Sequence, residues 1–228
     1  MRMRSRPPEA RAFGYAMTMA KARPSSLRAA LQTGKRVYLR RPTPRDEDEY
    51  LALRRRSAAF LQRWEPAAPS GKTPHQLYVE WVESARSGRH DKLLICRKGD
   101  DAILGAINLN EIIRGPAQSA FLGYWIGAAH ARQGYMTEAL TLALRHAFGR
   151  LRLHRVEANI LPVNVPSLAL VRRAGFHYEG YSPGYLEIDG RWEDHERWAV
   201  VADRWQRGRE KIGRRVTRSQ TRAIRSQP

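Results

Sequence analysis

The 228-residue sequence predicts a mixed α/β fold of the α+β kind, with about seven strands in a mostly antiparallel sheet and about four flanking helices. Three observations lead to this prediction. Strand-like runs separated by glycine-containing turns crowd into residues 92–127, which is typical of an antiparallel meander. Residues 120–161 then follow the order strand, helix, strand, which indicates a parallel crossover. The dipeptide Asp189-Gly190 lies between two long strand-like runs and is a strong hairpin signal.

One strand and two helices are expected before the meander. Alternating side chains predict a short strand at residues 37–40. Residues 43–62 are expected to be helical, because Thr43 can cap the helix, proline follows at its first position and acidic residues fill its first turn. A second helix is expected over residues 73–88, where a threonine and Gln76 have the spacing of a capping box.

The remaining elements follow from the spacing of apolar residues, which has a period of two in strands and 3.6 in helices. In chain order they are strands 92–97, 103–113 and 120–127, helix 137–148, strand 154–161, helix 167–173, and strands 176–188 and 192–201. Gly175 supplies the stop signal for the last helix. No internal repeat is visible, so we expect a single mixed sheet.

Charge divides the chain into a nearly neutral middle and two basic ends. The sequence has 41 Lys and Arg against 22 Asp and Glu, and the net charge of +19 by itself suggests a polyanionic partner. Residues 1–36 and 204–228 each carry nine basic residues and one glutamate, whereas residues 37–203 carry 23 basic and 20 acidic residues. We therefore expect a basic, disordered arm at residues 1–34, one domain at residues 35–203, and a basic tail at residues 204–228.

Composition also limits the compartment and the kind of site. Cys96 is the only cysteine, so an internal disulfide cannot form, and no apolar run approaches the ~18 residues of a membrane span. A cytoplasmic protein without a membrane partner is expected. His146 and His154 lack ligand spacing with cysteine or a carboxylate, so no metal site is expected.

The loop after the third meander strand has the features of a phosphate site. Arg132, Gln133 and Gly134 lead into a helix whose first turn offers backbone N–H groups without intrahelical partners. The helix dipole favours an anion there, and the glycine allows the backbone to approach it closely. A tight strand-to-helix turn that needs one glycine is the alternative interpretation of the same residues.

Four motifs in a fixed order resemble the GNAT acetyltransferase superfamily. They are the strand, loop and helix just described, followed by residues 154–159, 162–167 and 173–176. Residues 176–181 and 185–195 resemble its RimJ/RimL branch, the ribosomal-protein-alanine N-acetyltransferases. The resemblance covers about residues 35–203. It implies a GNAT fold and the transfer of an acetyl group from acetyl-CoA to an amine.

The resemblance implies a set of cofactor-binding residues in and around the loop. They are Trp125, Ile126, Arg132, Gln133, Gly134, Tyr135, Met136, Thr137 and Asn164. The loop departs from the family pattern at Ala131, where Gln or Arg is usual, and at Arg132, where glycine is often found. Backbone N–H groups of residues 133–137 can still bind the pyrophosphate, whereas a side-chain contribution from residue 131 is lost.

The resemblance also suggests which group protonates the leaving thiolate. Many members of the superfamily use a tyrosine seven residues after the asparagine that Asn164 matches, and this chain has Val171 there. In the RimL-like branch the candidate is a serine three residues after the asparagine, which is Ser167 here. Serine also favours helix N-caps, and both roles can coexist. Backbone N–H groups of residues 124–126 are expected to polarise the thioester carbonyl.

Four residues are candidates for the general base that deprotonates the amine. Glu111 is favoured because its expected strand lies next to the acetyl site, and Glu157 lies in the strand beside the cofactor. An ion pair between Glu157 and a nearby arginine is the alternative. His195 and Glu187 complete the set, although Glu187 is one residue away from the position used in RimL-like enzymes and would face the opposite side of its strand.

Trp64, Tyr185 and Trp192 are expected to bind the substrate, because the end of the first helix and the final hairpin flank the substrate in this family. Core packing is the alternative role for these aromatic residues. The expected substrate is a protein N-terminal α-amine, for example of a ribosomal protein. An α-amine with a pKa of ~7.7–8.0 is neutral at pH 7 far more often than a lysine with a pKa of ~10.4.

Two other functions remain open on the sequence. The enzyme could acetylate a small-molecule amine such as a polyamine, an amino sugar or an antibiotic, and an acidic pocket would favour this alternative. The chain could instead be a ribosome- or RNA-binding protein that keeps the fold with demoted catalysis, because its basic ends suit a phosphate backbone. A monomer or a homodimer is expected in each case.

Overall fold

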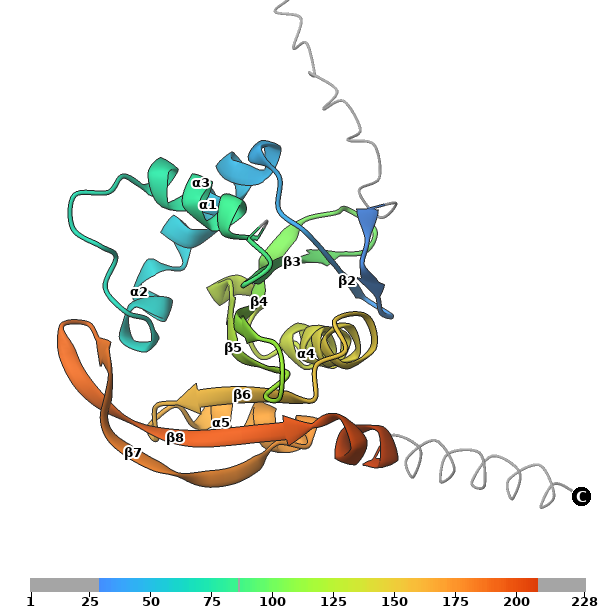
Figure 1. Cartoon of the computed structure of the whole chain (residues 1–228). Coiled ribbons are helices and arrows are strands. Elements are labelled where there is room, and N and C mark those ends of the chain that lie inside the picture. The colour runs from blue at the N-terminus through green and yellow to red at the C-terminus, as the bar shows by residue number, and fades with distance from the viewer. Residues whose placement is uncertain (1–28, 86, 209–228) are drawn as a thin grey trace, which may run out of the picture.

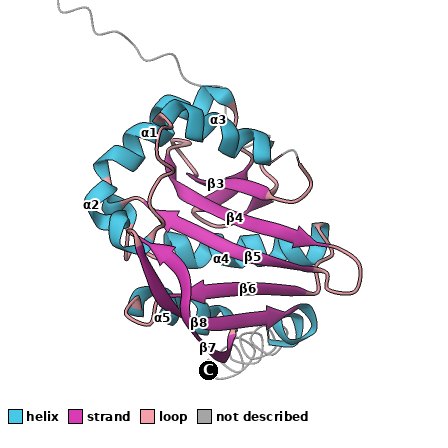
Figure 2. Ribbon diagram, turned by 60° about the vertical axis from the view of Figure 1, so that its left-hand side comes forward, coloured by secondary structure: helices cyan, strands magenta, loops and turns pink. Residues whose placement is uncertain are grey.

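A computed structural model describes residues 29–85 and 87–208, which form one eight-stranded sheet with helices on both faces (Figures 1 and 2). The strands are β1 (Gln32–Thr33), β2 (Val37–Arg40), β3 (Asp91–Arg97), β4 (Ile103–Ile113), β5 (Ser119–Ile126), β6 (Arg155–Ile160), β7 (His177–Ile188) and β8 (Arg191–Val201). The α-helices are α1 (Glu47–Arg56), α2 (Ala58–Leu61), α3 (Pro74–Ser84), α4 (Tyr135–Arg145) and α5 (Val165–Ala174). The short helical turns are η2 (Pro44–Asp46), η3 (Gln62–Trp64), η4 (Ala128–His130) and the π-helical η5 (His146–Arg150).

The sheet is mixed and mostly antiparallel, as predicted. Its strand order is β1-β2-β3-β4-β5-β6-β8-β7, and β5 with β6 is the parallel pair among the described strands. The seven expected strands lie within one residue of their predicted bounds, and the two-residue β1 is additional. β1 draws the last residues of the expected arm into the sheet. Most of that arm, and residues 209–228 of the expected tail, lie outside the described residues.

Local sequence signals for helix ends and turns are confirmed. Thr73 accepts a hydrogen bond from the Gln76 N–H at 3.2 Å, and the Gln76 side chain accepts one from the Thr73 N–H at 2.8 Å. Gly175 has a φ of 93° and ends α5. Asp189 and Gly190 both have positive φ, at 51° and 77°, as expected for a tight turn between β7 and β8.

The first helix is interrupted, which the sequence did not predict. Residues 43–62 were expected to be continuous, but the helix breaks at Ser57, where φ is −107° and ψ is 3°. The Ser57 hydroxyl accepts a hydrogen bond from the Ala128 N–H at 3.1 Å, which ties the break to the loop before α4. The chain after the break forms α2 and η3.

Two apolar cores hold the sheet between its helices. On one face, α4 packs against β1, β2 and β4, and α5 packs against β6. On the other face, α1 packs against β4 and α3 against β3, and the Tyr50 ring lies 4.9 Å from Trp81 and 5.4 Å from Trp125. We call these the α4 face and the α1 face. None of the described helices is both long and apolar enough to cross a bilayer.

A buried ion pair anchors the chain where it enters α1. Arg40 of β2 donates two hydrogen bonds to Asp46, at 2.8 and 2.6 Å. The Thr43 N–H and hydroxyl each donate to the same carboxylate at 2.8 Å. Burial alone would raise the pKa of Asp46, but the hydrogen bonds and charge of Arg40, with those from Thr43, lower it.

Candidate active site

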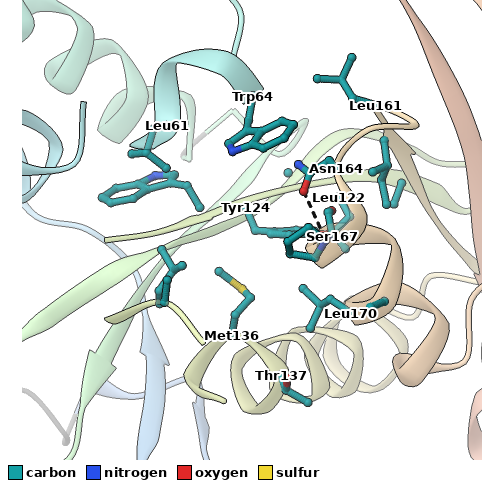
Figure 3. Close-up of a pocket in the computed structure, with 18 of the residues that line it drawn as sticks. Leu61, Trp64, Leu122, Tyr124, Met136, Thr137, Leu161, Asn164, Ser167 and Leu170 are labelled. Carbon is teal, nitrogen blue, oxygen red and sulfur yellow. Dashed lines mark hydrogen bonds between the residues drawn. The ribbon is translucent and has the colours of Figure 1, made fainter. Parts of the chain in front are cut away.

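The parallel strands β5 and β6 open a passage through the sheet. They pair only over residues 119–121 and 155–157. Beyond these residues both strands line a single cavity of about 650 Å³, whose other walls come from α2, η3, α5 and the N-terminal end of α4. Figure 3 shows Leu61 and Trp64 on one side of Tyr124, with Met136 and Thr137 on the other.

Strand alternation assigns the cavity lining to the two faces of the sheet. Leu122 belongs to the α4-face core and Tyr124 packs against it, whereas Trp125 belongs to the α1-face core. In β6, Ile160 belongs to the α4-face core, so its neighbour Asn159 points to the α1 face. The cavity therefore connects one face of the sheet with the other. A ligand on the α4 face can meet a second ligand that arrives from the α1 face.

The N-terminus of α4 is shaped to bind an anion at the α4-face entrance. Gly134 caps the helix with a φ of 80°, and Arg132 also lies in the left-handed region with a φ of 60°. Arg36 supports the loop by donating to the Gln133 carbonyl at 2.9 Å and by lying 4.7 Å over the Tyr135 ring. The first-turn N–H groups have no partner within the helix, and the dipole is positive there. These features suit a phosphate group.

Two hydroxyl groups meet deeper on the α4 face. The Asn164 side chain caps α5 by accepting a hydrogen bond from the Ser167 N–H at 3.2 Å, the dashed line of Figure 3. The Ser167 hydroxyl lies 2.5 Å from the hydroxyl of Tyr124. Burial raises the pKa of Tyr124 to about 12, so its phenol keeps its proton at neutral pH. Val171 occupies the sequence position at which many members of the superfamily have a tyrosine. The phenol that contacts Ser167 comes from Tyr124 of β5.

The α1-face side of the cavity is lined by aromatic side chains and a buried imidazole. Phe60 and Trp64 come from the segment after the helix break. His195 of β8 is only 3% exposed, and its Nδ1 lies 2.9 Å from the Glu193 carbonyl oxygen. Asn159 contacts the Tyr185 hydroxyl through its amide nitrogen at 3.4 Å.

The carboxylate on the α1-face side of the cavity is paired within the protein. Glu65 is the one carboxylate among the described residues that line the cavity. Arg54 donates to both of its oxygens, at 2.8 and 2.6 Å, and the Arg54 guanidinium lies 4.9 Å from the centre of the Trp125 ring. The cavity therefore presents no unpaired carboxylate from the described part of the chain.

Eleven of the predicted site residues line this cavity. They are Trp64, Trp125, Ile126, Arg132, Gly134, Tyr135, Met136, Thr137, Asn164, Ser167 and His195. Six predicted residues do not line it. They are Glu111, Gln133, Glu157, Tyr185, Glu187 and Trp192.

Specific contacts explain the positions of two of the four predicted base candidates. Glu111 has a φ of 47° at an irregular point of the β4–β5 pairing, and its carboxylate lies 2.5 Å from Arg89. Glu157 faces the α1 side but lies 3.0 Å from Arg155 and 3.7 Å from Arg197. The alternative expectation, that Glu157 pairs with Arg155, therefore describes its contacts.

Glu187 is exposed in β7, opposite Trp192 of β8. The three other residues lie near the cavity or beyond it. The Gln133 side chain donates to the Ala129 carbonyl at 2.8 Å. Tyr185 touches two lining residues, Asn159 and His195, the latter with 5.8 Å between ring centres. Trp192 is 69% exposed near the β7–β8 turn.

Comparisons with known proteins identify the family of the chain. Residues 36–177 match the family model described as an acetyltransferase (GNAT) domain. The chain belongs to the GNAT acetyltransferase family. This GNAT chain is 33% identical over 172 residues to the probable N-acetyltransferase YjcK of Bacillus subtilis, covering 74% of the chain and 95% of the relative. It is 32% identical over 203 residues to the ribosomal protein uS5-alanine N-acetyltransferase of Escherichia coli, covering 86% of the chain and all of the relative.

A solved structure supplies a ligand for comparison. The GNAT chain is similar to Mycobacterium smegmatis RimJ in complex with CoA-disulfide, with 31% identity and a TM-score of 0.68 over 73% of this chain and 82% of the other. The predicted GNAT fold and RimJ/RimL resemblance are thereby confirmed, and the enzyme is an acyltransferase of the N-acetyltransferase class. The loop before α4 and the apolar lining beyond it fit a coenzyme A molecule.

Proposed function

We propose that this GNAT enzyme transfers the acetyl group of acetyl-CoA to the N-terminal α-amine of a protein. The observation that carries the proposal is the passage between β5 and β6. It joins the N-terminus of α4 on the α4 face to the aromatic side chains that line the cavity on the α1 face. The E. coli relative, named for acetylating an alanine of ribosomal protein uS5, supports a protein acceptor.

The α4 face would hold the cofactor. The first-turn N–H groups of α4 and the side chain of Arg132 would bind phosphate groups. Leu122, Met136 and Leu170 would pack against the less polar pantetheine arm. When bound, acetyl-CoA supplies an activated thioester to the passage.

Backbone groups of β5 would polarise the acetyl carbonyl. The Gly127 N–H donates to Leu104 of β4 at 2.8 Å, and backbone groups alternate in direction along a strand. The N–H groups of Ile126 and Tyr124 are therefore expected to point toward the gap. Fixed donors at this point would stabilise the oxyanion that forms during acyl transfer.

Ser167 would protonate the departing thiolate, and Tyr124 would return a proton to Ser167. The contact between the two hydroxyl groups supports this relay, and the pKa of Tyr124 keeps the phenol protonated at neutral pH. We propose no catalytic role for Glu111 or Glu157, because both carboxylates are paired with arginine outside the cavity lining.

The lining of the α1 face favours an α-amine over a polyamine. A polyamine carries several positive charges and requires unpaired carboxylates, but Glu65 is already paired with Arg54. Arg63 and Arg173 add positive charge to the cavity wall. A single α-amine that loses its charge near pH 8 is compatible with this wall.

The basic ends of the chain would bring the enzyme to its substrate. Residues 1–36 and 204–228 together carry 18 of the 41 Lys and Arg residues. Such segments suit the phosphate backbone of RNA, and binding of this kind weakens steeply as salt rises. We therefore propose that the enzyme meets its substrate on or near the ribosome.

A peptide panel tests the proposed acceptor. The full chain is incubated with acetyl-CoA and peptides that begin with Ala or Ser, and free thiol and peptide mass are followed. Matched peptides with a blocked N-terminus and one internal lysine are the control, and spermidine is a second acceptor. We expect acetylation of the free N-termini alone. Preferential acetylation of spermidine, or of lysine in the blocked peptides, would refute the proposed acceptor.

A further inference from the structure

A buried histidine lines the passage on the α1 face. His195 lines the cavity although its side chain is almost fully buried. Its Nδ1 lies 2.9 Å from the Glu193 carbonyl oxygen. A carbonyl oxygen can only accept a hydrogen bond, so Nδ1 carries the hydrogen. In the neutral ring, Nε2 therefore keeps its lone pair and can accept a proton.

A buried amide oxygen next to this imidazole also lacks a donor. Asn159 lines the same cavity and uses its amide nitrogen to contact Tyr185, whose ring packs against His195. The Oδ1 atom of Asn159 is buried and has no hydrogen-bond partner among the described residues. Buried acceptors in native proteins are rarely left unpaired, so a donor brought by a ligand is expected here.

We propose that Nε2 of His195 is the general base that removes the proton from the acceptor amine, while Oδ1 of Asn159 accepts a second N–H of the same amine. Both groups reach the cavity from the side opposite Ser167. The amine would thus be held on the α1 face, with the thioester on the α4 face. The proposal rests on the N-acetyltransferase activity and does not depend on which amine is the acceptor.

The proton balance of the reaction assigns one task to each side of the passage. A bond forms between the amine nitrogen and the acetyl carbon, and the bond between that carbon and sulfur breaks. His195 takes the proton that the amine nitrogen loses and passes it to solvent. On the other side, Ser167 gives a proton to the thiolate and recovers one through Tyr124. One proton leaves and one is added, so the products are a neutral amide and a thiol.

The groups around His195 leave Nε2 available for the amine. On its own hairpin, Tyr185 packs against the imidazole and Asp194 interacts with it electrostatically. The charged residues Arg63, Glu65, Arg132 and Arg173 and the titratable His130 line the same cavity. Asp194 is held by the Tyr181 hydroxyl at 2.5 Å and by the Gly184 N–H at 2.7 Å. Since Glu65 is paired with Arg54, neither carboxylate is free to bind the imidazole.

His195→Asn is the variant that isolates the base. The asparagine amide can keep the hydrogen bond to the Glu193 carbonyl, but nothing replaces Nε2. We expect kcat to fall about 100-fold, within the usual range for loss of a general base, with unchanged CoA affinity and unfolding temperature. His177→Asn, in the exposed part of β7, is the matched control and should keep the wild-type rate. A wild-type rate in His195→Asn would overturn the proposal.

The pH profile separates a base from a structural residue. For the wild type, the acid limb of kcat/KM should have a limiting slope of two in log units, because the reaction needs both a neutral amine and a base that has not yet taken up a proton. His195→Asn should give a slope of one, from the amine alone. Equal slopes for the two proteins would contradict a role in proton transfer, even if the variant is slow.

A measurement on the free enzyme distinguishes failure of this proposal from failure of the proposed acceptor. Nitrogen-15 spectra of the imidazoles, assigned by comparison with His195→Asn, report which nitrogen carries hydrogen. We expect the Nδ1–H tautomer for the neutral ring of His195. The Nε2–H tautomer would overturn the proposal whichever amine is acetylated. The kinetic tests use the acceptor that gives the fastest turnover, whether peptide or spermidine.

Discussion

The hydroxyl oxygens of Tyr124 and Ser167 lie 2.5 Å apart, although one belongs to β5 and the other to the first turn of α5. The contact closes the α4-face side of the passage with two groups that can exchange a proton. Burial raises the pKa of Tyr124 to about 12, so its phenol can donate at physiological pH. Two hydroxyl groups from separate elements are thus brought together, whereas Val171 occupies the sequence position of the tyrosine that many members of the superfamily use.

The relay predicts unequal and non-additive losses on substitution. Ser167→Ala should lower kcat about 100-fold, because the thiolate then leaves without its nearest acid. Tyr124→Phe should lower kcat about tenfold, because Ser167 keeps its hydroxyl but loses its proton source. The double variant should be no slower than Ser167→Ala, since the two residues act as one unit. Single-turnover release of thiol measures each rate, and a double variant slowed by the product of the two factors would contradict a relay.

The relay also predicts how the rate depends on pH at the alkaline end. Because the pKa of Tyr124 is about 12, the phenol stays protonated at pH values up to about 10. Over that range, loss of its proton should therefore not reduce kcat. A decline between pH 8 and pH 10 that disappears in Tyr124→Phe would be evidence against a protonated phenol. Tyr178→Phe removes an exposed hydroxyl outside the cavity and serves as the control.

Local patterns were sufficient to predict most of the fold. The strands, the capping box at Thr73 and the β7–β8 turn depend on residues close in sequence, so their signals are visible without tertiary contacts. The break at Ser57 depends on a hydrogen bond from Ala128, 71 positions away, and no local pattern encodes it. No local pattern predicted β1, the two-residue strand at the edge of the sheet, either.

The candidate site was predictable where a single loop carries it and less so where separate elements meet. Arg132, Gly134 and their neighbours line the cavity because one strand-to-helix loop contains them. The strand of Glu111 was assigned correctly, but an irregular pairing turns its side chain toward Arg89. Alternation along β5 could have pointed to Tyr124, since it faces opposite to Trp125. The contact between Tyr124 and Ser167 joins two separate elements, so only the structure reveals it.

Asp46 should contribute to stability in a way that depends on pH. Replacing it with asparagine leaves the buried Arg40 without a counter-charge and should lower the free energy of unfolding by about 3 kcal/mol at pH 7. The folded-state pKa of Asp46 lies below its unfolded value, so its contribution is present above about pH 4 and is lost as pH falls through the folded pKa. Urea unfolding at pH 7 and pH 3 should therefore show a difference between wild type and Asp46→Asn that shrinks in acid.

A surface pair provides the control for Asp46. Asp100 binds Arg97 in an exposed position, and Asp100→Asn should cost less than about 1 kcal/mol. A loss at Asp46 as small as the loss at Asp100 would show that the buried pair adds little to stability.

The basic ends should affect ribosome binding and leave the chemistry unchanged. Replacing every Lys and Arg of residues 1–28 and 209–228 with Gln should weaken sedimentation with ribosomes and flatten its dependence on salt. The kcat/KM on a short Ala-terminal peptide should stay within about twofold of the wild-type value. An equal loss on the peptide would mean that these segments serve the active site, and unchanged sedimentation would argue against an RNA-binding role.

Gly134 should be required for coenzyme A binding because of its backbone conformation. Its φ of 80° is costly for any residue with a side chain, and a Cβ there would lie 3.0 Å from Arg36. Gly134→Ala should lower the free energy of unfolding by about 1–2 kcal/mol and distort the first-turn N–H groups, which should raise the Kd for CoA about tenfold. Gly149→Ala is the matched control, because a Cβ at Gly149 meets nothing within 4 Å. Calorimetric titration with CoA measures both variants, and equal affinities would show that the loop does not depend on the left-handed turn.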